Sequence, residues 1–318
     1  MIYAITHLTL YTYSEPVTDS VMEVRKQPRS EGPQRSLRFT LDVRPRAKLF
    51  HYRDEFGNVV HTFDLPAPHD RLAVKSEAVV EVKPLPALPD SLPESAWDEI
   101  DAITLEPAFY DLLLPGPFTH PTPLLAGFAQ EIGFRRGPDP LTTVRTLSTA
   151  LYKAIAYDQN VTQVDSPIDD ALEARRGVCQ DYSHIMLTLL REAGIPSRYV
   201  SGYLFHRRED HDRSQADASH AWVEVWLPSL GWVGFDPTNN LIVGERHVRV
   251  CVARDYFHAS PARGVFRGTA ETELDVRVKV ALMDELPVDE RELAPEIALP
   301  QYEMQSTLLH QQAQQQQQ

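Results

Sequence analysis

Hydrophobic and polar residues alternate through the first 85 positions of the chain in the manner of β-strands. The alternating runs cover residues 5–13, 36–45, 48–57, 58–66 and 71–84. Turn residues such as Gly57 and Asn58 separate these runs, as they do in an antiparallel sandwich or barrel. The pattern therefore predicts a β-rich N-terminal domain over residues 1–85.

The pattern changes twice after this domain. Residues 86–122 are rich in proline and are predicted to form a linker. Helical periodicity or strand alternation then marks a second domain over residues 123–282. Its predicted helices cover residues 123–134 and 140–158, and its predicted strands cover residues 220–227, 232–236, 247–254 and 273–282. We expect the last two strands to complete the sheet of this domain, and the fold class to be α+β.

Residues 283–318 have a different composition from the rest of the chain. They are acidic and rich in proline, and they end in a run of glutamines. Such a segment buries too little apolar surface to offset the entropy of ordering it. We expect a tail that is disordered or loosely docked.

A single cysteine stands at the start of a predicted amphipathic helix. An apolar stripe at helical spacing is formed by Tyr182, Ile185, Met186, Leu189 and Leu190. Gly177 allows the chain to turn into this helix, which therefore starts near Cys179, and Gly194 and Pro196 end it. Free N–H groups, the helix dipole and a nearby imidazolium lower the pKa of a thiol from about 8.5 to roughly 3.5–7.5. The backbone N–H of Cys179 is also a candidate donor to an oxyanion.

Two predicted strands downstream carry a histidine and an aspartate on the same sheet face. If Trp226 pairs with Trp232, His220 and Asp236 become diagonal neighbours, about 7–8 Å apart at the backbone. An imidazole and a carboxylate can bridge that distance. We predict that Cys179 is the nucleophile, that His220 moves its proton, and that Asp236 fixes the tautomer and orientation of His220.

These motifs resemble those of a known family. The run GVCQDYSH at residues 177–184 is similar to the cysteine motif of the transglutaminase-like superfamily, bacterial branch. The run SHAWVEVWLPSLGWVGFDPT at residues 219–238 is similar to its histidine–aspartate motif. Members of this branch are often described as cysteine proteases. A β-rich N-terminal region accompanies this branch, and it is similar to the present chain at residues 6–17, 25–30 and 54–63.

The resemblance extends over roughly residues 1–282 and implies both a fold and a chemistry. It implies a papain-like core, in which the nucleophile begins a helix that packs on an antiparallel sheet. It also implies a thioester acyl-enzyme and catalysis by Cys179, His220 and Asp236, none of which is substituted here. The superfamily contains transferases, amide hydrolases and non-catalytic scaffolds, so the resemblance leaves the reaction open.

Other residues near these motifs have structural as well as functional interpretations. We predict substrate contacts for Gln180 and Trp222, although a first-turn polar residue and a core tryptophan beneath the helix are alternatives. His184 is predicted to be a packed core histidine rather than a second base. Cys251 lies in an apolar run and is predicted to be a small buried hydrophobe.

One loop has the composition of a metal site without its pattern. It contains His206, Asp210, His211, Asp212 and Asp217. The loop lacks the glycine and the closing glutamate of a calcium loop. It also lacks the paired histidines of a zinc helix. We therefore predict that the protein uses no metal and no other cofactor.

Charge and cysteine content restrict the possible partners and compartment. The net charge is −14, from 31 basic and 45 acidic residues, which argues against nucleic acid as a partner. Two cysteines form no disulfide framework and indicate a reducing compartment. The sequence shows neither a signal-peptide pattern nor an apolar run long enough for a membrane span. We expect a cytoplasmic protein with no membrane partner, and its oligomeric state stays unknown.

These features together predict a thiol enzyme that attacks a peptide or side-chain amide. The thioester would be released to water or to an amine, and hydrolysis is favoured because no lysine-binding element is recognisable. The alternative reaction is that of a protein-glutamine gamma-glutamyltransferase. An alternative of another class is a non-catalytic peptide-binding or scaffolding module.

Overall fold

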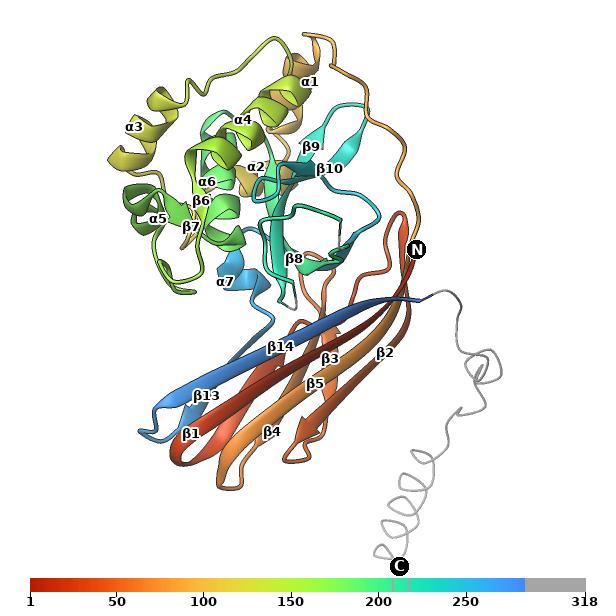
Figure 1. Ribbon diagram of the computed structural model, residues 1–318, viewed down its shortest axis with the longest axis vertical. Helices are drawn as coiled ribbons and strands as arrows, with labels where there is room; N and C mark the ends of the chain where they lie inside the picture. Colours follow the sequence, from red (N-terminus) through yellow and green to blue (C-terminus); the bar gives the residue numbers. More distant parts are fainter. Residues whose placement is uncertain (208, 217, 284–318) are drawn as a thin grey trace, which may run out of the picture. The chain divides into compact units, whose positions relative to one another are not determined.

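The chain begins with five β-strands in the computed structural model, which describes residues 1–207, 209–216 and 218–283. They are β1 (Ile2–Val24), β2 (Gln34–Arg44), β3 (Phe50–Arg53), β4 (Val59–Leu65) and β5 (His69–Val82). These strands form one antiparallel sheet in the order β2-β5-β1-β4-β3 (Figure 1). The predicted antiparallel β region at the N-terminus is confirmed.

The proline-rich segment is more than a linker. It contains α1 (Ala96–Ile103), α2 (Pro107–Tyr110) and the 3-10 helix η1 (Asp111–Leu113). Trp97 and Ile100 of α1 are buried in the main hydrophobic core. Pro107 occupies the first turn of α2, where a missing N–H costs nothing. The segment therefore forms helices, one of which begins at a proline, and it belongs to the folded core.

The central part of the chain is a helical layer on an antiparallel sheet. Its helices are α3 (Pro123–Glu131), α4 (Pro140–Ala154), α5 (Ile168–Ala174) and α6 (Cys179–Glu192). The sheet has the order β11-β10-β9-β8-β12. Its strands are β8 (Ser197–Leu204), β9 (His220–Leu227), β10 (Gly231–Asp236), β11 (Leu241–Ile242) and β12 (His247–Ala253). Helix α6 packs on β8 and β9, so the predicted α+β fold with a helix on an antiparallel sheet is confirmed.

Two short strands and one short helix complete the surroundings of α6. Strand β6 (Ala156–Tyr157) pairs in parallel with β7 (Arg176–Gly177), which directly precedes α6. Helix α7 (Tyr256–Ala259) follows β12 and contacts β8. Elements of two to four residues show no periodicity, so the sequence pattern could not predict them.

The last two described strands return to the N-terminal sheet. β13 (Ala262–Arg267) and β14 (Thr272–Met283) both pair with β1, and Figure 1 draws them in blue beside the red β1. The prediction that residues 273–282 complete the central sheet is wrong, whereas the same prediction for residues 247–254 is confirmed by β12. Alternation shows that a segment is a strand, but it does not show which sheet has an open edge for it.

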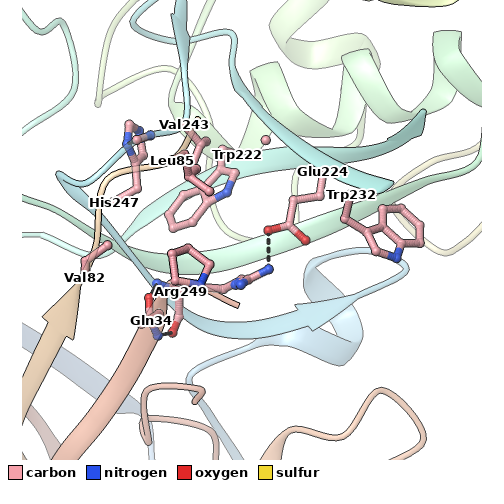
Figure 2. A pocket seen from close by; sticks show the side chains of 12 residues that line it. Gln34, Val82, Leu85, Trp222, Glu224, Trp232, Val243, His247 and Arg249 are labelled. Atoms are coloured by element: carbon pink, nitrogen blue, oxygen red, sulfur yellow. Dashed lines mark hydrogen bonds and ion pairs between the residues drawn. The ribbon is translucent and has the colours of Figure 1, made fainter. Parts of the chain in front are cut away.

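Side-chain amides of the N-terminal region cover the edge strand β12. The amide of Gln34 donates to the carbonyl oxygen of Arg249 and accepts from its N–H, both at 2.7 Å. Asn58 donates to the carbonyl oxygen of Val252 at 2.7 Å and accepts from its N–H at 2.9 Å. Figure 2 shows Gln34 beside Arg249, whose guanidinium is bound to Glu224 at 2.9 Å. The edge of the central sheet is therefore closed by two amides in place of another strand.

The main hydrophobic core also runs across both regions. It includes Leu187 of α6 and Val223 of β9, and it continues to Tyr3 of β1 and Val80 of β5. A second cluster, which includes Val17, Phe63 and other residues of the N-terminal sheet, lies within that sheet alone. The first core therefore joins the N-terminal strands to the helix that carries the cysteine.

Among the helices that the structure describes, none is long and apolar enough to span a membrane. The predicted tail covers residues 283–318, of which Met283 is the last residue of β14 and residues 284–318 lie outside the described residues.

Candidate active site

Helix α6 begins at Cys179, as the sequence predicts, and the side chain of this residue is half-buried. The carboxylate of Asp181 accepts hydrogen bonds from the backbone N–H of Val178 at 2.8 Å and from the hydroxyl of Thr162 at 2.6 Å. A Cβ atom on residue 177 would lie 2.6 Å from the Asp181 carboxylate. Gly177 is thus required by the close approach of a capping side chain, in addition to the turn that the sequence suggests.

The first turn of α6 leaves a backbone donor available at Cys179. The N–H of Cys179 has no acceptor within the helix, because it is the first residue of α6. Its role as an oxyanion donor stays a prediction. Gln180 is buried, and its side-chain amide donates to the carbonyl oxygen of Val164 at 2.9 Å. This contact fixes the preceding segment, and substrate contact by Gln180 stays a prediction.

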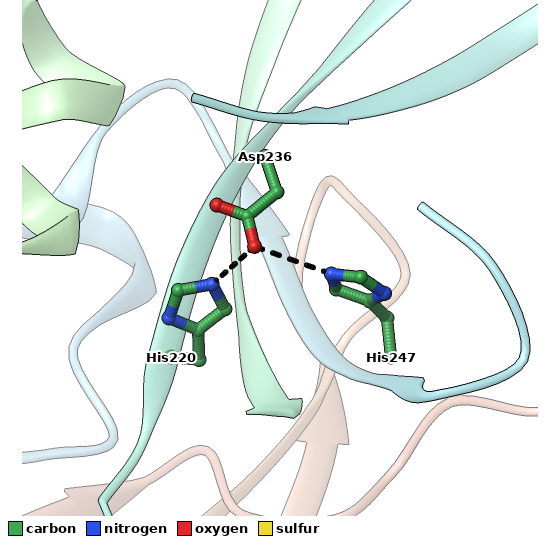
Figure 3. Close-up of side chains that lie close together, drawn as sticks. All are labelled: His220, Asp236 and His247. Carbon is green, nitrogen blue, oxygen red and sulfur yellow. Dashed lines mark hydrogen bonds and ion pairs between the residues drawn. The ribbon is translucent and has the colours of Figure 1, made fainter. Parts of the chain in front are cut away.

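The structure brings His220 and Asp236 together (Figure 3). Trp226 pairs with Trp232, which confirms the predicted register of β9 and β10. The Nε2 atom of His220 lies 2.7 Å from Oδ2 of Asp236. Their side chains are 3% and 0% exposed, so this pair is held away from solvent. Asp236 engages Nε2 of His220. The hydrogen bond between His220 and the side chain of Cys179 is therefore assigned to Nδ1.

Burial and charge act in opposite directions on this pair. Burial alone would lower the pKa of His220, but the charge and hydrogen bond of Asp236, followed by those of Cys179, raise it to about 10. Burial would also raise the pKa of Asp236, but the charge and hydrogen bond of His220, and then His247, hold it well below its ordinary value. At neutral pH the pair is therefore an imidazolium and a carboxylate.

Asp236 receives further donors that the sequence analysis did not identify. Its Oδ1 accepts from the N–H groups of Thr238 at 3.1 Å and Asn239 at 3.2 Å. Its Oδ2 accepts from the side-chain amide of Asn239 at 2.8 Å and lies 3.3 Å from Nε2 of His247. Asn239 follows Asp236 by three residues, a spacing typical of a turn in which a carboxylate caps backbone N–H groups. His247 had no comparable signal.

His220, Asp236 and His247 each have an atom that could bind a metal ion, and these three atoms lie within 4.8 Å of one another. This is the one such cluster in the described parts of the chain. Both imidazoles are directed at the same carboxylate oxygen in Figure 3. The hydrogen bonds account for each of these atoms, so the arrangement favours protons over a cation at this position.

In the loop of residues 206–217, which has the composition of a metal site, Asp210 and Asp212 both accept from Arg246. Asp217 of that loop lies outside the described residues.

The remaining predicted residues lie at defined places in the core. His184 is buried, stacks on Phe118 and accepts from the N–H of Tyr256 at 3.2 Å, which confirms a packed core histidine. Cys251 is fully buried, and burial raises the pKa of its thiol to about 12. Both residues are therefore enclosed by the protein, whereas Cys179 is half-buried.

Trp222 is a buried core residue, as the alternative interpretation holds, but it lies on the sheet face away from α6 and not beneath the helix. It packs with Val200 and Val252, whereas the alternate residues of β9 face α6. Its indole is 1% exposed and borders a pocket of about 80 Å³ with Gln34 and Arg249 (Figure 2). The ring also lies 6.0 Å from that of His220. Substrate contact by Trp222 stays a prediction.

A cysteine at the start of a central helix, beside a histidine and an aspartate on an antiparallel sheet, defines the papain-like class of folds. Within this class, the chain belongs to the transglutaminase-like superfamily. The family description of that superfamily matches residues 127–237. The description of the bacterial transglutaminase-like N-terminal region matches residues 3–81. Members of the superfamily are typically cysteine-dependent enzymes.

Similar proteins include both curated sequences and a solved structure. An uncharacterised protein of Mycobacterium leprae is 35% identical over 277 residues, which cover 87% of this chain and 97% of that protein. A protein-glutamine gamma-glutamyltransferase of Pseudomonas aeruginosa is 32% identical over 125 residues, or 37% of this chain and 19% of that protein. The crystal structure of a candidate cysteine protease from Cytophaga hutchinsonii superposes with a TM-score of 0.68 at 19% identity. This match covers 90% of this chain and 93% of the other, and it shows the shared fold.

Proposed function

We propose that the protein is a thiol amidase or peptidase that hydrolyses a peptide or side-chain amide through a thioester on Cys179. The observation that carries this proposal is the buried His220–Asp236 pair beside a half-buried cysteine at the start of α6. An imidazolium held by a carboxylate stabilises a neighbouring thiolate, which is the nucleophilic form of cysteine.

The reaction then follows from the protons that these groups hold. The thiolate of Cys179 adds to the amide carbonyl carbon, and the N–H of Cys179 donates to the oxyanion that forms. His220 gives its proton to the leaving amine as the C–N bond breaks, and the thioester remains. A water molecule then loses a proton to His220 and attacks the thioester, which releases the acid and restores the thiolate–imidazolium pair.

The first test needs no substrate. We expect Cys179 to be alkylated by iodoacetamide at similar rates from pH 6 to pH 9, because His220 keeps its proton up to a pH of about 10. In His220→Ala, the rate at Cys179 should rise with pH as it does for an ordinary thiol. Mass spectrometry of the peptides that contain Cys179 and Cys251 gives both rates in one sample.

Cys251 is the internal control for this experiment, because its buried thiol should stay slow throughout. If Cys179 has the same pH profile in the wild type and in His220→Ala, the proposed nucleophile loses its physical basis. A non-catalytic binding module on the same fold would then be the better description.

Amine transfer is the second candidate reaction, and the partial match to the P. aeruginosa gamma-glutamyltransferase favours it. Hydrolysis and transfer share every step up to the thioester. Incubation of a glutamine peptide with a primary amine separates them by product mass: hydrolysis gives glutamate, and transfer gives the substituted amide. Cys179→Ala should abolish either product, and a product that survives this substitution would belong to another site.

A further inference from the structure

His247 lies at the start of β12 and contacts Asp236 of the proposed catalytic pair. Its Nε2 atom lies 3.3 Å from Oδ2 of Asp236, the same oxygen that His220 approaches at 2.7 Å (Figure 3). The ring of Trp222 packs on it edge-to-face at 5.2 Å. His247 is 5% exposed, so its contacts are made within the protein.

The hydrogen bonds of His247 define its tautomer. Its Nδ1 atom lies 3.4 Å from the backbone N–H of Gly244. A backbone N–H can only donate, so Nδ1 acts as the acceptor and the ring proton is on Nε2. The N–H at Nε2 therefore donates to the carboxylate of Asp236.

The ring is also uncharged. Burial lowers the pKa of His247, and the opposing attraction of Asp236 does not reverse this effect. The other charged groups that act on it are His220 and Arg246, both of which also lower its pKa. A neutral donor orients the carboxylate without adding a second positive charge beside the imidazolium of His220.

We propose that His247 is a positioning residue for the catalytic pair: its Nε2–H fixes the Asp236 carboxylate, which in turn holds His220 toward Cys179. This role rests on the proposed function and adds a fourth side chain to the site. Trp222 and the Gly244 N–H hold the ring of His247 in place. The strand that carries it is the one that Gln34 and Asn58 of the N-terminal region bind.

Two substitutions of similar size separate positioning from packing. In His247→Gln, the amide nitrogen extends about as far as Nε2 and can still donate to Asp236. In His247→Asn, the shorter amide reaches only the position of Nδ1, so it can meet Gly244 but not Asp236. Both variants replace the ring by a polar amide, and they differ in which contact of His247 the amide can reproduce: that with Asp236 in His247→Gln and that with Gly244 in His247→Asn.

The main readout is the ratio of the iodoacetamide rates at Cys179 at pH 6 and pH 9.5. We expect this ratio to fall about tenfold in His247→Asn, the size expected for loss of a hydrogen bond to a charged group. In His247→Gln the ratio should stay within about twofold of the wild type. A general loss of stability would lower the melting temperature without changing this ratio in the folded protein.

The second readout is independent of the thiol. The proton between His220 and Asp236 should give a low-field imidazole signal in the proton NMR spectrum, which His220→Ala identifies by its loss. This signal should persist in His247→Gln and broaden or disappear in His247→Asn. If both variants keep the wild-type ratio and signal, or if both lose them equally, the positioning role is refuted. A wild type that hydrolyses no amide but shows these NMR differences would refute the proposed function and leave the role of His247 standing.

Discussion

At the scale of single residues, the two buried charged groups Asp236 and Lys26 have opposite surroundings. The carboxylate of Asp236 accepts hydrogen bonds from two imidazoles, one amide side chain and two backbone N–H groups. Lys26 is equally buried, yet among the described residues its hydrogen-bond partners are uncharged: the hydroxyl of Thr9 at 2.6 Å and the carbonyl oxygen of Val74 at 3.2 Å. Burial lowers the pKa of Lys26 to about 7. Folding therefore stabilises the charged form of Asp236 and destabilises the charged form of Lys26.

Lys26→Met should therefore stabilise the protein most at neutral and lower pH. The unfolded chain binds a proton at Lys26 up to a pH of about 10.4, whereas the folded chain releases it near pH 7, so folding carries the full penalty below about pH 7. The penalty disappears as the pH rises to about 10 and amounts to at most ~5 kcal/mol. Urea unfolding of both proteins at pH 6.5, 8 and 9.5 measures the difference.

The exposed residue Lys83 provides the control, because Lys83→Met should leave the pH dependence of the wild type unchanged. An advantage of Lys26→Met that is the same at all three pH values would show that packing, and not the charge of Lys26, accounts for it.

Sequence patterns located the residues that lie within contiguous motifs and missed one that does not. Cys179, His220 and Asp236 each occur in a run whose local structure is recognisable, and the structure places His220 and Asp236 within hydrogen-bond distance. His247 reaches Asp236 only because β12 and the turn at Gly244 return the chain to the site. No spacing along the sequence reports such a contact.

At the scale of elements, the start of α6 is fixed by packing as much as by helix propensity. Asp181 binds the N–H of Val178 and the hydroxyl of Thr162, and this carboxylate occupies the space beside Gly177. The same scale shows where periodicity failed. The sequence of β14 alternates like that of a half-buried strand, but Val278 is its one buried residue, and the strand joins the edge of the long strand β1.

Gly177→Ala tests this account of α6. The added methyl group would displace the Asp181 carboxylate, which should destabilise the protein by about 2 kcal/mol. Displacement of the first turn should also slow alkylation of Cys179 at pH 6. Urea unfolding and the alkylation rate measure the two effects.

Gly127→Ala in α3 is the matched control for that substitution. Apart from its chain neighbours and the backbone of its own helix, no described atom lies within 4 Å of a Cβ at residue 127, so alanine should be neutral or stabilise the helix by up to ~1 kcal/mol. Similar losses in both variants would contradict the role of the Asp181 contact.

At the scale of the whole described chain, the N-terminal sheet and the central sheet share one hydrophobic core. Tyr3 and Val80 belong to the same cluster as the residues of α6. Residues 86–122 contribute to it as well, although their prolines indicate a linker by composition. A high proline content identifies a segment that turns often, but it does not show whether that segment packs into the hydrophobic core.

Asn58→Ala should weaken both regions together. It leaves the N–H and the carbonyl oxygen of Val252 buried without their partner, at a cost of about 3 kcal/mol. All four tryptophans lie outside the N-terminal sheet, so their fluorescence reports the central region, while circular dichroism reports both. We expect the two signals to shift together to lower urea concentration.

Asn160→Ala, at an exposed position, should leave both transitions in place. A fluorescence transition that is unchanged in Asn58→Ala would show that the central region unfolds on its own.

The pairing of β13 with β1 has a consequence for synthesis on the ribosome. Residues 21–24 of β1 bind β4 along one edge and residues 262–265 of β13 along the other. The transglutaminase-like core is thus an insertion within the N-terminal sheet, between β5 and β13. One edge of β1 has no partner until more than two hundred further residues have emerged, so the first domain to be made is among the last to be finished.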